Sequence, residues 1–547
     1  MTVLAASRSL VHISFDGWQT PNGKLALTGV YVHHLNEEGR VVDYMLALPA
    51  QLGQHSGINY AEVIGNVLDT FKITKERLGY FITDNAYTND TCLDYLAVKF
   101  GFNKAHRRAR CACHILNLVA QQLMFGKNKE AFENEDANIP EEEEFLEQWR
   151  KEGPLGTLCD LINSINTPQL VQLFEQYQVD ENIPPQKGFR IKQLIKPVKT
   201  RWNSYHAAFE RAVELQAPLN SFAQYQITKY EKETASLRSK GKKVPEPRRY
   251  IAVGGLNAYD WSIINEYMEI LSPLKEATSL VEGRGKAGKH GAIWEVIPTF
   301  DWLLRVFEEK KDRVAEATIE DYPNQEAIED HFMINLNAAW AKLNEYYLKL
   351  DDTPVYYTAV LLHPHFKRFC QNAWKDRPDW IISGDADFQT LWLQYKNRSL
   401  PSSAEPEAPP PKRVRASAGR DSHIDAYSGA STSSQMVCED EYARWKLLDP
   451  LPKEHPLAQD PIRYWWQMQI EFPRLAQFAF DILTIPATSS DCERGFSEAG
   501  DLLEPRRSRL QPMMIAALQC TRSWKKMGYK KAAREGSKSI KLYKADS

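Results

Sequence analysis

Short apolar runs with the two-residue period of strands alternate with longer segments of helical period in the N-terminal part of the chain. In order, they predict strands over 10–15, 25–33 and 41–48, a helix over 60–71, a strand over 78–83 and a helix over 89–100. The turn-forming sequences Pro21-Asn22-Gly23 and Glu38-Gly39 separate the first three strands. These strands are therefore expected to form an antiparallel meander.

Further along the chain the apolar spacing becomes helical. Residues 155–374 place apolar side chains three and four positions apart and predict an all-helical region. Pro, Ser, Ala and Gly dominate 400–435, a composition that cannot bury a core and predicts a linker. Residues 440–526 are again helical in pattern. The N-terminal order of strands and helices matches half of a ribonuclease-H-like domain, so the predicted fold class is α/β plus all-α: a ribonuclease-H-like mixed sheet interrupted by a large helical insertion.

These patterns divide the chain into six segments. They are the first part of the α/β domain (1–125), an acidic loop (126–150), the helical insertion (151–398), the Pro- and Ser-rich linker (399–438), a helical C-terminal segment that completes the α/β domain (439–527) and a basic tail (528–547). A chain of 547 residues has room for one domain with an insertion of this size.

Composition narrows the class of protein. Hydrophobic residues make up 43% of the sequence and charged residues 25%, as in an ordinary globular protein. No apolar run reaches the roughly 18 residues that a membrane helix needs, so a cytosolic or nuclear protein without a membrane partner is predicted. The eight cysteines are scattered and include no C-x-x-C pair, which disfavours a disulfide framework and a zinc finger.

Charge is unevenly distributed, although the net charge is only −3. Acidic residues dominate 133–147, whereas 522–547 contain nine basic and two acidic residues. A basic tail of this kind can contact the phosphates of a nucleic acid, and it can equally be a solvated tail.

Two aspartates follow predicted strands. Asp16 comes directly after the first strand in SFDGW, and Asp84 directly after the fourth in ITDNA. Each could cap the turn that follows it, which is a common role of aspartate. On neighbouring strands, however, both carboxylates would point out of the same sheet edge. Together they could hold divalent cations through oxygen ligands.

A third carboxylate is needed if these aspartates are to cleave a phosphodiester, because such sites use two cations roughly 3.5–4 Å apart. Glu493 in ATSSDCERGFSEAG is the candidate. The spacing from Ser490 to Glu493 also fits the capping box that begins a helix, and periodicity alone favours the cap.

Six short motifs occur in an order that resembles the hAT superfamily of DNA transposases. They are SFDGW (14–18), ITDNAYTN (82–89), CACHILNLV (111–119), TRWNS (200–204), LLHPHFK (361–367) and ATSSDCERGFSEAG (487–500). Each is weak by itself, but their order and spacing are hard to meet by chance. The resemblance implies that Asp16, Asp84 and Glu493 form an Asp-Asp-Glu triad. It would bind two Mg²⁺ or Mn²⁺ ions and cleave and transfer DNA strands, with no small-molecule substrate.

The same resemblance assigns further residues to DNA. Trp18 and the pair Cys111 and His114 match active-site elements of the family. His114 would contact the scissile phosphate, while Cys111 packs as a small apolar group. Arg201 and Trp202 match an Arg-Trp element whose tryptophan stacks on a base, a contact worth about 1–3 kcal/mol. Trp202 could instead be a core residue of an amphipathic helix.

The C-terminal part of the chain carries three more expectations. The aromatic-rich residues 440–526 resemble the family's dimerisation segment and imply a homodimer or higher homo-oligomer, although the same side chains could cover the helical insertion. Arg506, Arg507 and Arg509 could contact DNA phosphates. The sequence PKRVR (411–415) resembles a nuclear-import signal but could be a solvated charge run, so the nucleus is the expected location.

Full-length members of the family carry a BED-type zinc finger ahead of the first strand. Here fifteen residues precede Asp16, and no matching Cys/His cluster is present, so no segment is assigned to recognise transposon ends. The leading hypothesis is a transposase catalytic core. Its rivals are a catalytically inactive, transposase-derived nuclear protein that binds DNA and dimerises, and a ribonuclease-H-like nuclease unrelated to transposition.

Overall fold

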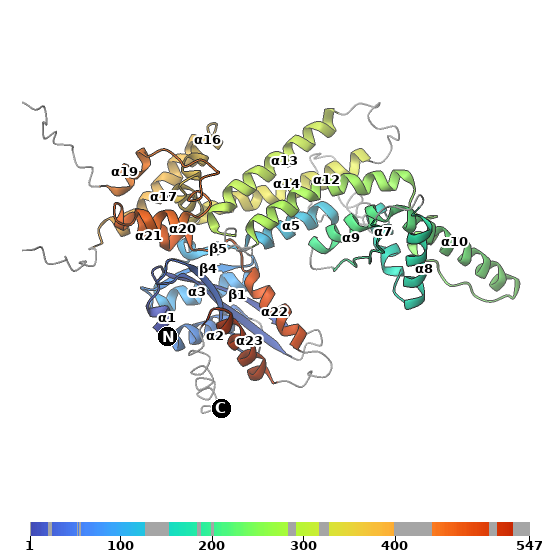
Figure 1. The fold of residues 1–547 in the computed structure, drawn as a ribbon, viewed down its shortest axis with the longest axis horizontal. Coiled ribbons are helices and arrows are strands. Elements are labelled where there is room, and N and C mark those ends of the chain that lie inside the picture. Colours follow the sequence, from blue (N-terminus) through green and yellow to red (C-terminus); the bar gives the residue numbers. More distant parts are fainter. Residues whose placement is uncertain are drawn as a thin grey trace, which may run out of the picture. The chain divides into compact units, whose positions relative to one another are not determined.

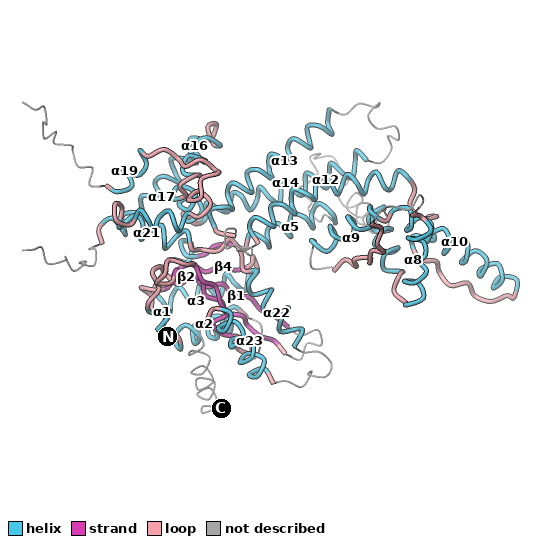
Figure 2. Tube along the Cα trace, in the orientation of Figure 1, coloured by secondary structure: helices cyan, strands magenta, loops and turns pink. Residues whose placement is uncertain are grey.

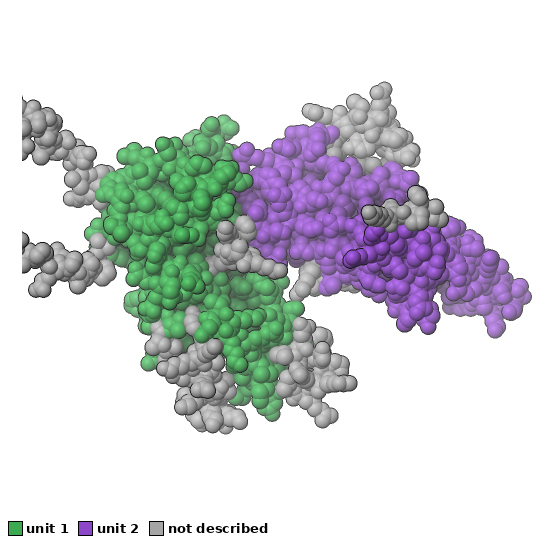
Figure 3. Space-filling model, viewed as in Figure 1, with its two compact units in different colours: residues 1–110, 283–296, 350–547 green, residues 111–282, 297–349 purple. Residues whose placement is uncertain are grey.

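The protein is described by a computed structural model in which helices and one sheet account for most of the chain (Figures 1 and 2). The described residues are 2–19, 25–51, 53, 56–125, 153–182, 188–198, 202–282, 291–316, 328–398, 440–502 and 511–528. They divide into two compact units (Figure 3). The first unit contains Met1–Arg110, Gly283–Val296 and Leu350–Ser547, and the second Cys111–Glu282 and Ile297–Lys349.

The first unit contains a five-stranded mixed sheet with the strand order β3-β2-β1-β4-β5. β1 pairs antiparallel with β2 and parallel with β4; β2 also pairs antiparallel with β3, and β4 pairs parallel with β5. The strands are β1 (Val11–Gln19), β2 (Ala26–Leu35), β3 (Val41–Ala47), β4 (Leu78–Thr83) and β5 (Arg108–Arg110). The predicted meander and the fourth strand are confirmed.

Two strands differ from the prediction. β1 continues beyond residue 15 to Gln19 because it stays paired with β2, from His12 opposite His33 to Gln19 opposite Ala26. β5 is not predicted, since a three-residue strand with two arginines shows no apolar alternation. At the predicted turn before β3, Gly39 has a φ of +70°, a backbone conformation that glycine adopts at little cost. The predicted turn at 21–23 lies outside the described residues.

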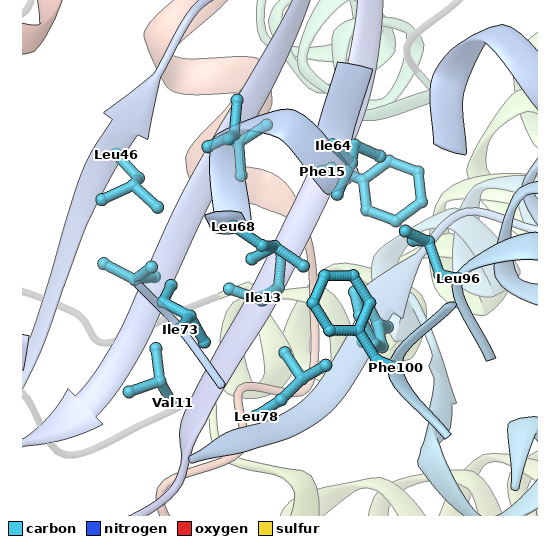
Figure 4. Close-up of a cluster of buried hydrophobic side chains, with 14 of the residues drawn as sticks. Val11, Ile13, Phe15, Leu46, Ile64, Leu68, Ile73, Leu78, Leu96 and Phe100 are labelled. Carbon is cyan, nitrogen blue, oxygen red and sulfur yellow. The ribbon is translucent and has the colours of Figure 1, made fainter. Parts of the chain in front are cut away.

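One face of the sheet is covered by α2 (Gly57–Thr70) and α3 (Tyr87–Phe100), which follow the sequence prediction closely. The apolar side chains between them form a core whose members include Val11, Ile13, Phe15, Leu46, Ile64, Leu68, Ile73, Leu78, Leu96 and Phe100 (Figure 4). All are at most 9% exposed, and complete burial of such a side chain stabilises the fold by about 1.5–3 kcal/mol. This core fixes β1 and β4 side by side.

The opposite face is covered by two helices from the other end of the chain, α22 (Ser490–Leu502) and α23 (Pro512–Lys526). Ser14, Asp16 and Trp18 belong to this face of β1, since side chains alternate along a strand. The core between sheet and helices includes Leu27, Tyr31, Met45, Leu48, Cys492, Phe496, Ala499, Ile515 and Cys520. At Gly495 a Cβ atom would clash with the Tyr31 hydroxyl, so the glycine permits the close approach of α22.

The remaining described helices of the first unit are α1 (Thr2–Ala5), α4 (Lys104–Arg107), η2 (Ile293–Glu295), η3 (Lys349–Asp352), α15 (Val355–Leu362), η4 (Phe366–Arg368), α16 (Phe369–Ala373), α17 (Pro378–Lys396), α19 (Glu441–Leu447), α20 (Pro461–Met468) and α21 (Pro473–Leu483). Those from α15 to α21 form an aromatic-rich cluster. Asp481 of α21 joins this cluster to the sheet, because its carboxylate accepts hydrogen bonds from the Leu10 backbone at 2.7 Å and the Tyr395 hydroxyl at 2.9 Å.

The second unit is helical, as predicted for this region. Its helices are α5 (Ala112–Phe125), α7 (Pro154–Ser164), α8 (Pro168–Asp180), α9 (Trp202–Glu214), α10 (Gln216–Ser239), α11 (Arg249–Ala252), α12 (Ala258–Val281), α13 (Val296–Glu316) and α14 (Ile328–Leu348). Its limits differ from the predicted insertion, since α5 is grouped with this unit and α15 to α17 with the first. Among the described helices, none has the length and apolar character needed to cross a lipid bilayer.

Candidate active site

The two aspartates lie where β1 and β4 separate. The parallel pairing of β1 with β4 ends at Ser14 opposite Ile82, whereas β1 runs on beside β2. Asp16 is therefore inside β1, two residues beyond the last pair, and not at the end of the strand as predicted. Asp84 directly follows β4. Both aspartates thus lie just beyond the point where β1 and β4 stop pairing, where side chains from the two strands can approach each other.

Asp16 is close to two other carboxylates. The pKa of Asp16 is raised to about 7, most of all by burial, then by the charge of Asp84 and to a smaller extent by that of Glu493. The Gly17 backbone N–H, which donates to Asp16 Oδ1 at 2.7 Å, opposes this rise. Asp16 is therefore within electrostatic range of both other carboxylates of its unit. The ligand oxygens of the three do not, however, all lie within 4.8 Å of one another among the described residues.

Asp84 is held by its own turn. The Ala86 backbone N–H donates to Asp84 Oδ1 at 2.9 Å, and the Asn89 side-chain amide donates to the same oxygen at 2.5 Å. Asp84 thus caps the turn, as the simpler interpretation of the sequence requires. Its Oδ2 has no hydrogen-bond partner among the described residues, so capping leaves one oxygen available to a cation.

Glu493 lies in the first turn of α22 and is exposed. The predicted capping box requires Ser490 to precede the helix and Glu493 to bond back to the Ser490 backbone, and the structure differs from this arrangement. Ser490 is the first residue of the helix, and its backbone N–H lies 3.4 Å from Thr488 Oγ1. Among the described residues Glu493 has neither a hydrogen bond nor an ion pair, so its carboxylate remains available as a ligand.

The set of donors fits hard divalent cations. Three carboxylates offer the oxygen ligands that Mg²⁺ and Mn²⁺ prefer. No described lysine or arginine forms an ion pair with Asp16, Asp84 or Glu493. Burial and, after it, the charges of Asp84 and Glu493 raise the pKa of Asp16, and a bound cation would offset this repulsion.

Tyr60 of α2 is a member of the site that sequence reasoning misses. Its hydroxyl packs so closely on Gly17 that a Cβ at residue 17 would clash with it. Burial raises the pKa of the Tyr60 hydroxyl, and the charges of Asp16 and Asp84 add to the rise. The only sequence signal is the glycine after Asp16, which marks a close approach without naming its partner.

Asn89 provides a first test of this geometry. Replacing Asn89 by alanine removes the donor that orients the Asp84 carboxylate, and groups of this kind typically contribute 10- to 100-fold to metal affinity. We expect the Asn89→Ala variant to bind Mn²⁺ roughly 10-fold more weakly, measured by isothermal titration. Asn66→Ala, in the neighbouring helix α2, is the control. Equal affinity for all three proteins would contradict the assigned role of Asn89.

The remaining predicted DNA contacts that the structure describes belong to both units. Trp18 stacks on Phe496 of α22, with ring centroids 6.0 Å apart and an interplanar angle of 10°. Trp202, in the second unit, is 3% exposed, as the core interpretation requires, and its backbone N–H donates to Asn117 at 3.3 Å. His114 lies on α5 of the second unit and is partly buried. Their roles at DNA stay predictions.

Several other predicted features fall outside the described residues. They are Arg201, Arg506, Arg507, Arg509, the acidic loop at 126–150, the linker at 399–438 with its basic sequence at 411–415, and the basic tail beyond residue 528.

Known proteins resemble this chain over most of its length. It is 23% identical to a candidate transcriptional regulator of Talaromyces stipitatus over 92% of this chain and 52% of that protein. It is 21% identical to the candidate AC transposase of Zea mays over 93% of this chain and 56% of that protein. A candidate AC9 transposase of Zea mays is also 21% identical, with 93% and 57% covered. The chain therefore spans about half the length of these relatives.

The C-terminal helices identify the class of protein. Residues 440–525 match the hAT family C-terminal dimerisation region, so the chain carries a segment of the type that joins subunits. Together with the similarity to the two maize transposases, this match supports a relationship of the chain to the hAT transposases.

Proposed function

We propose that this chain is the catalytic core of an hAT-type DNA transposase, which cleaves and transfers DNA strands with Asp16, Asp84 and Glu493 holding two Mg²⁺ or Mn²⁺ ions. The observation that carries the proposal is the electrostatic coupling of Asp16 to both other carboxylates, although Glu493 comes from the opposite end of the chain. A merely structural trio of acidic groups would be expected to have basic partners.

Each residue has a separate task. Asp84, fixed by Ala86 and Asn89, presents Oδ2 in a constant direction. Asp16 presents Oδ2 in the same way, because Gly17 holds Oδ1. The cations would activate the attacking water or hydroxyl and neutralise the leaving oxygen. The Tyr60 hydroxyl would donate a hydrogen bond to a carboxylate or phosphate oxygen beside Asp16, since its raised pKa keeps the hydroxyl protonated.

The strand order supports a ribonuclease-H-like fold, with the second unit as its helical insertion. Strand β1 carries the first aspartate in the middle of the sheet, and β4 beside it carries the second. We further propose that the partners are DNA and a second copy of this chain, and that the nucleus is the location. Contacts of Trp18, His114, Arg201, Trp202, Arg506, Arg507 and Arg509 with DNA belong to this proposal.

A second candidate function is favoured by one comparison. The relative from Talaromyces stipitatus is named as a transcriptional regulator, not as a transposase. A catalytically inactive protein that binds DNA and dimerises would keep the fold and the C-terminal segment but would not need the three carboxylates. The two functions therefore differ in the consequence of removing a single carboxylate.

The test is nicking of supercoiled plasmid in Mn²⁺ by the wild type and the Glu493→Gln variant. Because Glu493 is exposed and unbonded, the substitution preserves the fold, and we expect the nicking rate to fall by at least about 100-fold.

Glu498→Gln is the matched control. It removes a carboxylate from the same helix that pairs with Arg522 and Lys526 on the surface, and nicking should continue at the wild-type rate. Absence of nicking by the wild type, or equal nicking by Glu493→Gln, would favour the inactive DNA-binding protein.

A further inference from the structure

A second group of metal-ligating side chains lies apart from the three carboxylates. It consists of His33 on β2, Asp43 on β3 and Asp491 on α22, whose ligand atoms all lie within 4.8 Å of one another. We propose that these three residues form a binding site for a single transition-metal ion of the Zn²⁺ class. The ion would fasten the start of α22 to the sheet.

His33 has the arrangement expected of a metal-binding imidazole. The side chain is completely buried, and its Nε2 lies 2.8 Å from the Ser14 hydroxyl. Its Nδ1 lies 2.6 Å from Asp43 Oδ1. Because a serine hydroxyl can accept as well as donate, Ser14 can stabilise the tautomer that carries its proton on Nε2. That tautomer leaves the lone pair of Nδ1 directed at a cation.

The group brings two carboxylates, Asp43 and Asp491, to one imidazole. Asp491 pairs with Arg494 at 2.6 Å, but the Arg494 side chain is 52% exposed, and an ion pair in water is weak. A divalent ion bound to both carboxylates would neutralise them more effectively. The Asp43 and Asp491 side chains are 21% and 27% exposed, so both can rotate, and water can reach a fourth coordination position.

Only a small rearrangement is required. Ligands of tetrahedral Zn²⁺ lie about 2.0–2.2 Å from the ion and therefore roughly 3.4 Å from one another. Asp43 would move slightly away from His33, and Asp491 slightly inwards, while the buried imidazole stays in place.

The ligand types separate this site from the proposed catalytic one. One imidazole with two carboxylates suits Zn²⁺, Co²⁺ or Mn²⁺, whereas three carboxylates suit Mg²⁺ and Mn²⁺. Binding here does not depend on the proposed function. The consequence of binding for catalysis does rest on the proposed function. Asp491 precedes Glu493 by two residues in the same helical turn, so an ion at Asp491 would also hold the third proposed catalytic carboxylate in position.

The experiment uses Co²⁺, whose visible absorption reports coordination by nitrogen and oxygen. The full-length chain with Asp16→Asn, Asp84→Asn and Glu493→Gln lacks the proposed catalytic ligands, and we expect it to bind one Co²⁺ per chain. Adding Asp491→Asn should weaken this binding by at least about 100-fold, and Asp43→Asn should do the same. Adding Glu498→Gln instead should leave it unchanged, and circular dichroism verifies that each variant is folded.

Two results would overturn the inference: no Co²⁺ binding by the triple variant, or equal binding after Asp491→Asn and Asp43→Asn. The outcome is separable from that of the nicking assay. If the wild type does not nick DNA while the triple variant binds one Co²⁺, the proposed catalytic function fails and the His33 site stands. If the wild type nicks DNA but the triple variant does not bind Co²⁺, the proposed catalytic function stands and the His33 site fails.

Discussion

Replacing Asp16 with asparagine is expected to abolish strand cleavage and, at the same time, to stabilise the metal-free protein above neutral pH. Nicking should fall by at least about 1,000-fold, because a neutral amide would be a poor replacement for a carboxylate proposed to hold the cations. The stability effect has the opposite sign, since the introduced amide retains an oxygen for the Gly17 N–H but carries no charge.

The pH dependence follows from the pKa of Asp16, which is about 7 in the folded chain against an ordinary value of 3.8. Between these values the folded state binds more protons than the unfolded state, so wild-type stability falls as the pH rises from about 4 to 7. Wild type and Asp16→Asn should be equally stable below this window. Above it, the variant should be more stable by roughly 2–4 kcal/mol.

Urea denaturation in EDTA at about pH 4 and at pH 8 measures this difference. Adding Mg²⁺ at pH 8 should stabilise the wild type and leave the variant unaffected, because Mg²⁺ is expected to bind only the three-carboxylate site, which the variant lacks. A variant that is less stable than the wild type at both pH values would show that Asp16 is a structural residue.

Trp465→Ala is expected to have the largest effect on stability. Trp465 is completely buried in the first unit, its ring centroid lies 5.0 Å from that of Trp445, and its indole N–H donates to the Leu362 carbonyl at 2.8 Å. Truncation leaves a large cavity and an unsatisfied carbonyl, at a cost of about 3–5 kcal/mol.

The denaturation midpoint in urea, followed by circular dichroism, reports this loss. Trp465→Phe should cost less, since the phenyl ring fills most of the space and only the hydrogen bond is lost. Leu447→Ala, at a side chain 83% exposed in the same segment, should change stability by less than about 0.5 kcal/mol. Equal midpoints for Trp465→Ala and Leu447→Ala would contradict the packing described for α20.

Local patterns in the sequence predict the sheet well because they are physical causes of it. The alternation of Ile13 and Phe15 with polar neighbours sets the two faces of β1, and the buried run at 78–83 defines β4 without error. β5 escapes prediction because its three residues show no apolar alternation, and it is held by pairing with β4 and by hydrogen bonds of its backbone with Tyr356, which lies far along the chain. The limits of the two units also escape, since they depend on contacts between distant segments.

The candidate site is predictable only in part, for the same reason. Asp16 and Asp84 can be placed on neighbouring strands from the order of the elements, and their short-range caps follow from the turn sequences. Nothing in the spacing brings Glu493 to them, so that assignment depends on the family resemblance. Tyr60, Asn89 and His33 look like ordinary helix and strand positions, and only the folded arrangement places them beside acidic groups.

The position of α22 has a consequence for biosynthesis. The helix that covers the sheet next to Asp16 also bears Glu493, and it emerges from the ribosome only after the whole second unit has been made. A growing or prematurely terminated polypeptide would therefore contain Asp16 and Asp84 but not Glu493. On the proposed mechanism such fragments could not cut the genome, and nuclease activity would begin only once translation has passed the segment that also recruits a second subunit.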